Sequence, residues 1–152
     1  MDILATLLGT GGLLWTLSFF ILAIGIIVFV HEYGHYIVGR WSGIHAEVFS
    51  LGFGKVIYAR TDKRGTRWQV AALPFGGYVK FMGDANAASA GHVDELGGLT
   101  AQQLRATMHG APLWARSATV AAGPVFNFIL SLLVARQRAA IEAARAEPEP
   151  LV

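Results

Sequence analysis

The chain has 152 residues, of which 54% are hydrophobic and 14% are charged, and its mean hydropathy is +0.48. Soluble domains carry about 25% charged residues, so this composition indicates a membrane protein. It excludes a disordered chain, a collagen and a disulfide scaffold, and the absence of cysteine excludes thiolate metal ligands and thiol catalysis. A net charge of +2 gives no indication of a nucleic-acid partner.

The first predicted element is a membrane-spanning helix over residues 13–39. No charged residue occurs between Asp2 and His31, and residues 13–30 are almost entirely apolar over a length that can cross a bilayer. The alternative is a secretory signal peptide, which needs a basic N-terminal region. Asp2 and the absence of Lys or Arg before the apolar run disfavour that alternative.

The second membrane-spanning helix is predicted over residues 115–135. Residues 117–135 carry no charge, and they include Gly123-Pro124, a pair that transmembrane helices tolerate when neighbouring groups satisfy the freed backbone. A buried helix of a soluble domain is the alternative. The fold class that follows is a mainly α membrane protein, in which two transmembrane helices flank a cytoplasmic loop with a small β-hairpin.

The orientation follows from the basic residues. Nine of the twelve lie in residues 31–116, so the positive-inside rule places the loop 40–116 in the cytoplasm and the N-terminus outside. Arg136 and Arg138, which follow the second helix, oppose this orientation.

A β-loop is predicted over residues 47–82. Residues 55–60 and 66–73 alternate and are rich in β-formers, residues 62–65 have turn chemistry, and a further short strand follows the bend at Pro74. Residues 83–112 are expected to form a loop with a short helix near 101–108. Residues 136–152 are expected to form a charged, Ala-rich tail that is helical at first and disordered at its end.

The residues with the clearest chemistry are His31-Glu32-Tyr33-Gly34-His35, an H-E-x-x-H motif. Residues four apart share one face of a helix, so His31 and His35 can both bind one Zn²⁺ ion. Glu32 can then act as the catalytic base toward a water molecule activated by the metal. Ionisable residues at membrane depth are costly and mark functional sites. The alternative is that these histidines merely lie at the membrane interface.

Other metal-site classes fit less well. Val38 and Trp41 stand where the extended metzincin motif needs Gly and His, and two histidines on one helix cannot approach a haem iron from opposite faces. Several residues have side chains that could supply a third zinc ligand. For each of them, and for His45, the alternative is an ordinary solvent-exposed loop residue, which we favour. These candidates are His92, Asp94, Glu95, His109, Asp84 and Glu47.

Four features together resemble the site-two protease family of intramembrane zinc metalloproteases, in its bacterial RseP-type form. They are the motif at 31–35 on the first helix, Gly52-Phe53-Gly54 before the hairpin, the segment 74–81, and Ala122-Gly123-Pro124 with Asn127 on the second helix. The resemblance covers residues 13–135.

The resemblance implies a multi-pass protein of the bacterial inner membrane that cuts transmembrane segments of single-span proteins, such as an anti-sigma factor, using Zn²⁺. It implies that His31 and His35 are metal ligands and that Glu32 is the catalytic base. The β-loop would present the substrate as an extended strand. The candidate substrate-binding residues are therefore Gly76, Gly77, Tyr78 and Asn127. A turn is the alternative role for the two glycines, and a hydrogen bond between helices is the alternative for Asn127.

The chain departs from this family in two respects. The family's third ligand, an Asp in an Asn-Pro…Leu-Asp-Gly type motif, has no counterpart in these 152 residues, and the second helix leads into Arg136-Gln137-Arg138 and a short tail where RseP-type members continue into PDZ domains. We therefore expect residues 1–135 to be the N-terminal part of a protease domain, or a chain truncated or frameshifted after about Val134. Two functions stay open: a zinc protease completed by further residues, and an inactive membrane protein or regulator that binds through the β-loop.

Overall fold

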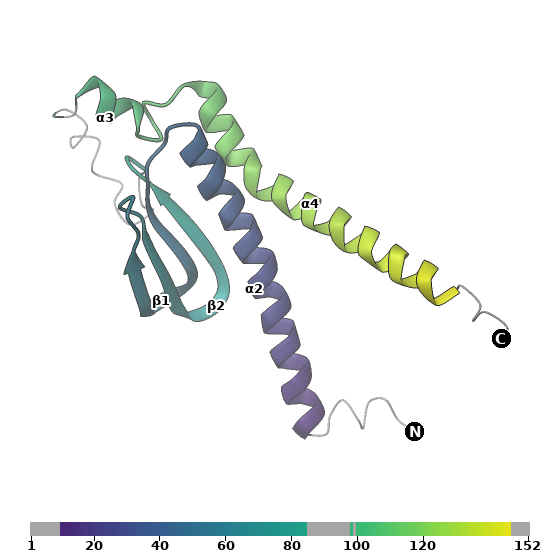
Figure 1. The fold of residues 1–152 in the computed structure, drawn as a ribbon. Coiled ribbons are helices and arrows are strands. Elements are labelled where there is room, and N and C mark those ends of the chain that lie inside the picture. The colour runs from purple at the N-terminus through teal and green to yellow at the C-terminus, as the bar shows by residue number, and fades with distance from the viewer. Residues whose placement is uncertain (1–9, 85–97, 99, 147–152) are drawn as a thin grey trace.

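The computed structural model describes residues 10–84, 98 and 100–146 (Figure 1). In chain order, its elements are the helix α2 (Thr10–Trp41), the strands β1 (Ala46–Thr61) and β2 (Arg67–Phe81), the short helix α3 (Ala101–Arg105), and the helix α4 (Leu113–Ala146). The fold is mainly helical with one two-stranded antiparallel sheet, as the sequence predicts.

Both long helices contain a candidate membrane span. The spans are Gly12–Trp41, with 30 residues, and Leu113–Arg145, with 33 residues. At a rise of about 1.5 Å per residue, each exceeds the roughly 30 Å of a bilayer core. The most apolar window of α2 is 0% buried within the described chain, and that of α4 is 17% buried. By length and composition, both helices can therefore cross a membrane.

The helices are longer than the sequence indicates. α2 begins before residue 13 and ends after residue 39, and α4 passes through Pro124 without a break and continues to Ala146. Residues 136–146, expected as a separate tail, therefore continue the second helix, because their Ala-rich composition favours helix propagation. The disordered end expected at residues 147–152 lies outside the described residues.

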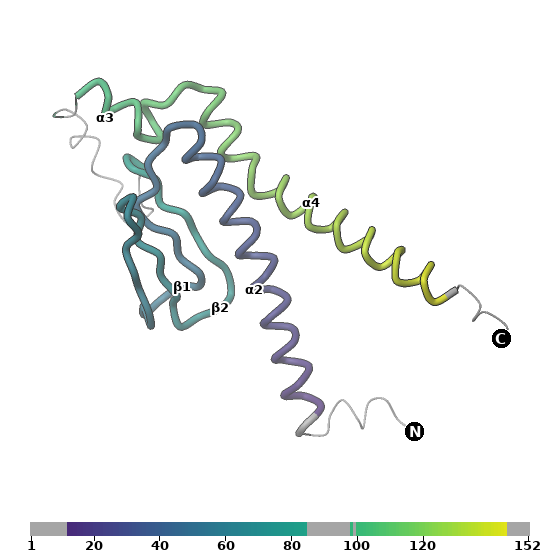
Figure 2. The backbone as a smooth tube through the Cα atoms, viewed as in Figure 1, coloured from purple at the N-terminus to yellow at the C-terminus, as the bar shows by residue number. Residues whose placement is uncertain are grey.

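The two long helices approach each other closely at one point and diverge from there (Figures 1 and 2). Gly34 marks the approach, because a Cβ atom there would lie 2.7 Å from the carbonyl oxygen of Ala122 and 2.9 Å from Cγ of Phe126. Small residues allow membrane helices to pack backbone against backbone. Gly34 is the fourth residue of the H-E-x-x-H motif, so the close approach lies within the motif itself.

The strands form a curved sheet with an unusual register. Residues 48–51 of β1 pair on one side with residues 77–80 of β2 and on the other with residues 67–70, while residues 56–61 pair with residues 67–71. Residues 74–76, which include Pro74, have no partner in this register, as expected for a residue without an N–H donor. The further strand predicted after Pro74 is thus the second half of β2, and its residues 77–81 lie at an edge of the sheet.

The core lies between the sheet and the C-terminal end of α2. Three aromatic rings make its centre: the ring centroids of Tyr36 and Phe49 are 5.8 Å apart, those of Tyr36 and Trp68 are 5.0 Å apart, and those of Phe49 and Trp68 are 4.3 Å apart. Fully or nearly buried residues from the flanking segments, Ile44, Phe81 and Ala115, complete it. This packing fixes the hairpin against the helix that carries the motif.

The loop between the hairpin and α4 is described in part. Helix α3 spans Ala101–Arg105 and is shorter than the helix predicted near 101–108. Its N-terminus has a capping box, in which the side chains of Thr100 and Gln103 bond to each other's backbone N–H. Backbone bonds from His45 N–H to the carbonyl oxygen of Ala106 and from Met108 N–H to that of Met82 attach the segment to the hairpin.

Candidate metal centre

The helix α2 brings His31 and His35 to one face. Their ring centroids are 4.8 Å apart and the ring planes meet at 78°. This is the outcome expected from a spacing of four residues in a helix. The two imidazoles face α4, because the helices approach each other at Gly34, between the two histidines.

Helix α4 contacts the Nδ1 atom of each ring. The Nδ1 atom of His35 lies 2.7 Å from the carbonyl oxygen of Thr119, and the Nδ1 atom of His31 lies 3.2 Å from Nδ2 of Asn127. A carbonyl oxygen only accepts hydrogen bonds, so Nδ1 of His35 carries the proton and its Nε2 carries the lone pair. Metal-binding histidines characteristically donate the second ring N–H in this way.

The Nε2 atoms of the two rings converge on Gly123 of α4. A Cβ atom at Gly123 would lie 2.7 Å from Nε2 of His31, and it would be closer still to Nε2 of His35. The missing side chain therefore leaves open the space to which both atoms point. Zinc binds imidazole nitrogen at about 2.0–2.1 Å, so the pair of histidines fits two ligands of a zinc ion.

Glu32 lies beside this pair and against the edge of the sheet. A Cβ atom at Gly77 would lie 3.0 Å from Cγ of Glu32 and 2.7 Å from the carbonyl oxygen of Ser50. Glycine at this position thus lets β2 approach the carboxylate side chain. A pocket of about 280 Å³ opens here, and it is lined by Glu32, His35, Gly77, Tyr78, Val79, Phe81, Asp84, Met108, Thr119 and Val120.

Of the candidate third ligands within the described residues, Asp84 lines this pocket. Burial raises the pKa of its carboxyl group, and the charges of His109 and Lys80 oppose the rise. Glu47 is instead held by Lys80, with 2.9 Å between Oε2 and Nζ. Among residues 10–84, 98 and 100–146, no three His, Cys, Asp or Glu side chains come together as a metal site. His92, Asp94 and Glu95 lie outside the described residues.

The residues predicted to bind substrate separate into two groups. Gly77 and Tyr78 line the pocket with Glu32, and the Tyr78 hydroxyl accepts a hydrogen bond of 3.1 Å from Gln69 Nε2. Gly76 has a φ angle of +127° and faces the ring of Phe53, which fits its alternative role in a bend. Asn127 contacts His31, which joins the two helices by a side-chain bond.

Two residues that face the histidines, Thr119 and Gly123, were not predicted from the sequence as parts of the site. Thr119 acts through its backbone carbonyl group, which every residue carries, so its side chain gives no signal. Gly123 was noted for its effect on the helix backbone, whereas the structure shows that both Nε2 atoms point at it. A glycine of the second helix facing the predicted zinc ligands is the signal that could have identified it.

Several known proteins are similar in sequence to most of this chain. The chain is 54% identical over 115 residues to a predicted zinc metalloprotease of Agrobacterium fabrum. The aligned region covers 76% of this chain and 30% of that protein. The chain is 42% identical over 120 residues to a predicted zinc metalloprotease of Vibrio cholerae, covering 79% of this chain and 24% of that protein. It is 40% identical over 121 residues to the regulator of sigma-E protease RseP of Salmonella typhimurium, with the same coverage.

The chain spans about a quarter to a third of the length of these relatives. The profile of peptidase family M50 matches residues 19–140. This match takes in the histidine pair, Glu32, the hairpin and the facing residues of α4, and it extends over most of the chain. The chain therefore belongs to peptidase family M50.

Proposed function

We propose that this chain carries the histidine pair and the catalytic base of a zinc metalloendopeptidase of the site-two protease type, which cleaves transmembrane segments of membrane proteins. One observation carries the proposal: the Nε2 atoms of His31 and His35 converge on Gly123, with Glu32 between them and the edge of a sheet. Family membership and the names of the relatives support it.

His31 and His35 would hold the zinc ion through Nε2. When bound, the ion would lower the pKa of a water molecule and polarise the peptide carbonyl group. Catalytic zinc sites have at least three protein ligands. We place the third ligand among residues that the structure does not describe, or in the part of the longer relatives that this chain does not span.

Glu32 would move the proton. Its side chain borders both the histidines and the pocket, so its carboxylate can take the proton of the attacking water. The same group would then deliver that proton to the nitrogen of the leaving peptide segment. Position 32, next to the first ligand, suits this role because the carboxylate reaches the same space without occupying a ligand position.

The substrate would bind as an extended strand along residues 77–81 of β2. These residues pair with residues 46–51 on one side, and Gly77, Tyr78, Val79 and Phe81 line the pocket beside Glu32. An edge strand can accept one more strand through backbone hydrogen bonds. A helix hides its peptide bonds, so an unwound substrate would expose them to attack. Gly76 would bend β2 so that Gly77 and Tyr78 face the substrate.

The proposed location is the bacterial inner membrane, with the N-terminus outside and the loop 40–116 in the cytoplasm. Two helices of spanning length and the basic residues of that loop support this placement. The substrates would be single-span membrane proteins. The name of the Salmonella relative, a regulator of sigma-E protease, favours an anti-sigma factor among them.

The test is a chimera in which this chain replaces the matching 115-residue segment of the Agrobacterium relative. Cleavage of a single-span reporter is measured in membranes for the chimera with Glu32 and with Glu32→Gln. General acid–base catalysis contributes about 100- to 10,000-fold, so we expect Glu32→Gln to reduce cleavage by that factor. Glu47→Gln is the matched control, because Glu47 pairs with Lys80 and does not line the pocket beside Glu32, and it should cleave normally.

Cleavage by the Glu32→Gln chimera at the unchanged rate would contradict the proposal. A well-expressed chimera that neither binds zinc nor cleaves would instead support the alternative, an inactive membrane protein or a regulator that binds through the β-loop.

A further inference from the structure

Within the described residues, the side chain of Asn127 has one hydrogen-bond partner, which is His31. Asn127 lies four residues after Gly123 on α4, and its Nδ2 atom is 3.2 Å from Nδ1 of His31. The Oδ1 atom of the same amide is buried and has no hydrogen-bond partner within the described part of the chain. A buried amide oxygen without a partner is costly, so this contact needs an explanation.

The contact as placed would leave His31 unable to bind a metal ion through Nε2. If Nδ2 of Asn127 donates to Nδ1 of His31, the proton of the neutral ring sits on Nε2. His35 shows the opposite arrangement, because the carbonyl oxygen of Thr119 requires the proton on Nδ1. The two rings would then present one N–H and one lone pair to the space at Gly123, whereas a zinc ion needs two lone pairs.

A half-turn of the amide resolves this conflict. Rotation by 180° exchanges Nδ2 and Oδ1, two groups of nearly the same size and shape, without moving another atom. Oδ1 then accepts a hydrogen bond from Nδ1–H of His31, and the lone pair of Nε2 faces Gly123. The rotation sacrifices no other hydrogen bond described for this side chain, because the outer atom of the amide has no partner.

We propose that Asn127 is a positioning residue for His31, with Oδ1 accepting the Nδ1 proton so that Nε2 is free for the metal ion. The inference rests on the proposed function, since it needs His31 as a zinc ligand. It gives α4 the same role toward both imidazoles: the carbonyl group of Thr119 fixes His35, and the amide of Asn127 fixes His31. It also gives Asn127 a role other than the substrate contact expected from the sequence.

The test compares two variants of nearly equal size in the chimera with the Agrobacterium relative, because that chimera includes the part of the relative that this chain does not span. The chimera is reconstituted in lipid nanodiscs and titrated with zinc chloride against a chromophoric chelator. Asn127→Leu removes the oxygen that would accept the Nδ1 proton of His31. Asn127→Asp keeps an oxygen acceptor and removes the amide N–H donor. Loss of a group that orients a metal ligand reduces metal affinity about 10- to 100-fold, so we expect that loss for Asn127→Leu and near wild-type affinity for Asn127→Asp.

Ser131→Ala is the matched control on α4. Ser131 donates to the backbone carbonyl oxygen of Asn127 and lies one turn further along, so its replacement should leave zinc affinity unchanged. A second measurement is ¹⁵N NMR of the zinc-loaded chimera with labelled histidine, with His31 assigned through His31→Gln. We expect a protonated Nδ1 on His31 in the unchanged chimera and in Asn127→Asp.

The outcomes separate the two proposals. If His31→Gln and His35→Gln lose zinc while Asn127→Leu keeps full affinity, the positioning role is overturned and the metal site stands. Equal losses in Asn127→Leu and Asn127→Asp, or an unprotonated Nδ1 on His31 in the zinc-loaded chimera, also overturn it. If the chimera with the unchanged segment binds no zinc, or if His31→Gln and His35→Gln bind as tightly as the unchanged chimera, the metal site and the positioning role both fall.

Discussion

Gly123 and Asn127 show how much of the site depends on residues of the second helix. The motif on α2 supplies the imidazoles and the carboxylate, but α4 determines what space lies in front of them. Gly123 leaves that space open, and the polar groups of Thr119 and Asn127 lie behind the rings. A side chain at position 123 would compete directly with any ligand of the two Nε2 atoms.

Gly123→Ala should therefore weaken zinc binding by the chain. The added methyl group would lie 2.7 Å from Nε2 of His31 and closer to Nε2 of His35. Overpacking costs about 1–3 kcal/mol, which corresponds to an affinity loss of roughly 5- to 150-fold. Alanine favours helix over glycine by about 0.5–1 kcal/mol, so the helix itself should persist. Zinc titration measures the affinity, and circular dichroism measures the helix content.

Gly25→Ala is the control for this prediction, because a Cβ atom at Gly25 of α2 meets nothing within 4 Å. It should bind zinc as the wild type does. Unchanged zinc affinity in Gly123→Ala would show that the metal ion does not occupy the space in front of Gly123.

Some residues of the site could be predicted from a sequence pattern within one segment, and others could not. His31, Glu32 and His35 could be predicted, because their spacing on one helix determines that they share a face. The contacts of Thr119 and Asn127 could not be assigned, since 84 and 96 residues separate them from their partners. Only the approach of α4 to α2 at Gly34 decides which groups of the second helix meet the imidazoles.

At the scale of elements, the turn between β1 and β2 attaches the hairpin to α2. Asp62 Oδ1 accepts hydrogen bonds from the backbone N–H groups of Arg64 and Thr66, at 2.8 and 3.0 Å. Its Oδ2 accepts from Trp68 Nε1 at 3.2 Å and from the hydroxyl of Tyr36 at 3.5 Å. One carboxylate thus closes the turn and joins it to the helix that carries the motif.

The charge of this carboxylate makes the attachment sensitive to acid. Burial acts to raise the pKa of Asp62, but the hydrogen bonds from Trp68, Arg64 and Thr66 and the charge of Arg40 outweigh it and lower the pKa below its ordinary value. Because the pKa of Asp62 is lower in the folded chain than in the unfolded chain, the ionised carboxylate stabilises the folded state at pH values above the unfolded pKa of about 3.9. That contribution is lost as the pH falls through the lower folded-state pKa.

We therefore expect the Nε1–H proton resonance of Trp68 to be constant near neutral pH and to shift only below about pH 4. The measurement is an acid titration by NMR of the chain in nanodiscs. Asp62→Asn should abolish this acid-dependent shift and weaken the hairpin attachment at neutral pH. A Trp68 shift that is unchanged in Asp62→Asn would assign the acid response to another group.

The hairpin illustrates which parts of an element can be predicted. The turn at 62–65 and the adjoining strands follow from local alternation and turn residues, and the structure confirms them. The second pairing of residues 48–51, with 77–80, joins segments nearly 30 residues apart. Its register depends on the bend at Pro74 and on packing against α2, so local pattern does not determine it.

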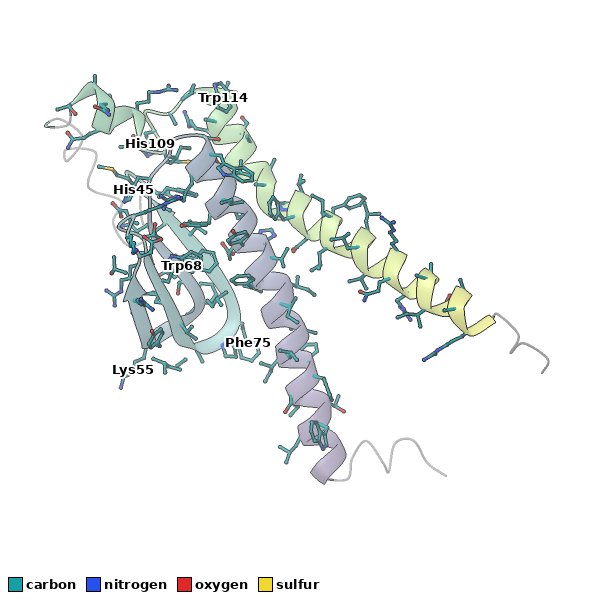
Figure 3. The ribbon with its side chains drawn as sticks, in the orientation of Figure 1. His45, Lys55, Trp68, Phe75, His109 and Trp114 are labelled. Atoms are coloured by element: carbon teal, nitrogen blue, oxygen red, sulfur yellow. The ribbon has the colours of Figure 1, made fainter. Side chains whose placement is uncertain are left out.

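At the scale of the whole molecule, the hairpin lies along α2 and its two ends differ. Figure 3 shows Lys55 and Phe75 at the far end of the sheet, and His45 and His109 near the other end, where Trp114 lies in the first turn of α4. Besides Lys55, this part of the hairpin carries exposed apolar side chains: Phe75 is 64% exposed, Ile57 is 71% exposed and Phe53 is 43% exposed. Because this end lies beside the apolar part of α2 (Figure 1), we expect lipid to cover it.

This arrangement predicts different accessibility at the two ends of the hairpin. The chain has no cysteine, so Arg64→Cys and Phe75→Cys each provide a single labelling site. We expect a membrane-impermeant maleimide to label Arg64→Cys only after the cytoplasmic side is opened. Phe75→Cys should react much more slowly on either side, because lipid shields it. Labelling of cells and of inverted membrane vesicles makes the comparison.

Rapid labelling of Arg64→Cys in intact cells would reverse the orientation inferred from the basic residues. Equal reaction rates at positions 64 and 75 would show that the far end of the hairpin lies in water. Matched denatured samples, in which both thiols should react fully, control for expression.

The sequence by itself determined the two apolar helices, the hairpin turn and the pair of histidines with its glutamate, because each depends on hydrophobicity or spacing within one segment. The tertiary structure decided how those segments meet: which groups of α4 contact the imidazoles, and which edge of the sheet borders Glu32. Contacts between distant segments depend on the close approach of two backbones at Gly34 and at Gly77, where the absence of a side chain sets the distance. A local pattern shows that a residue is glycine, and only the fold shows what that glycine allows to come near.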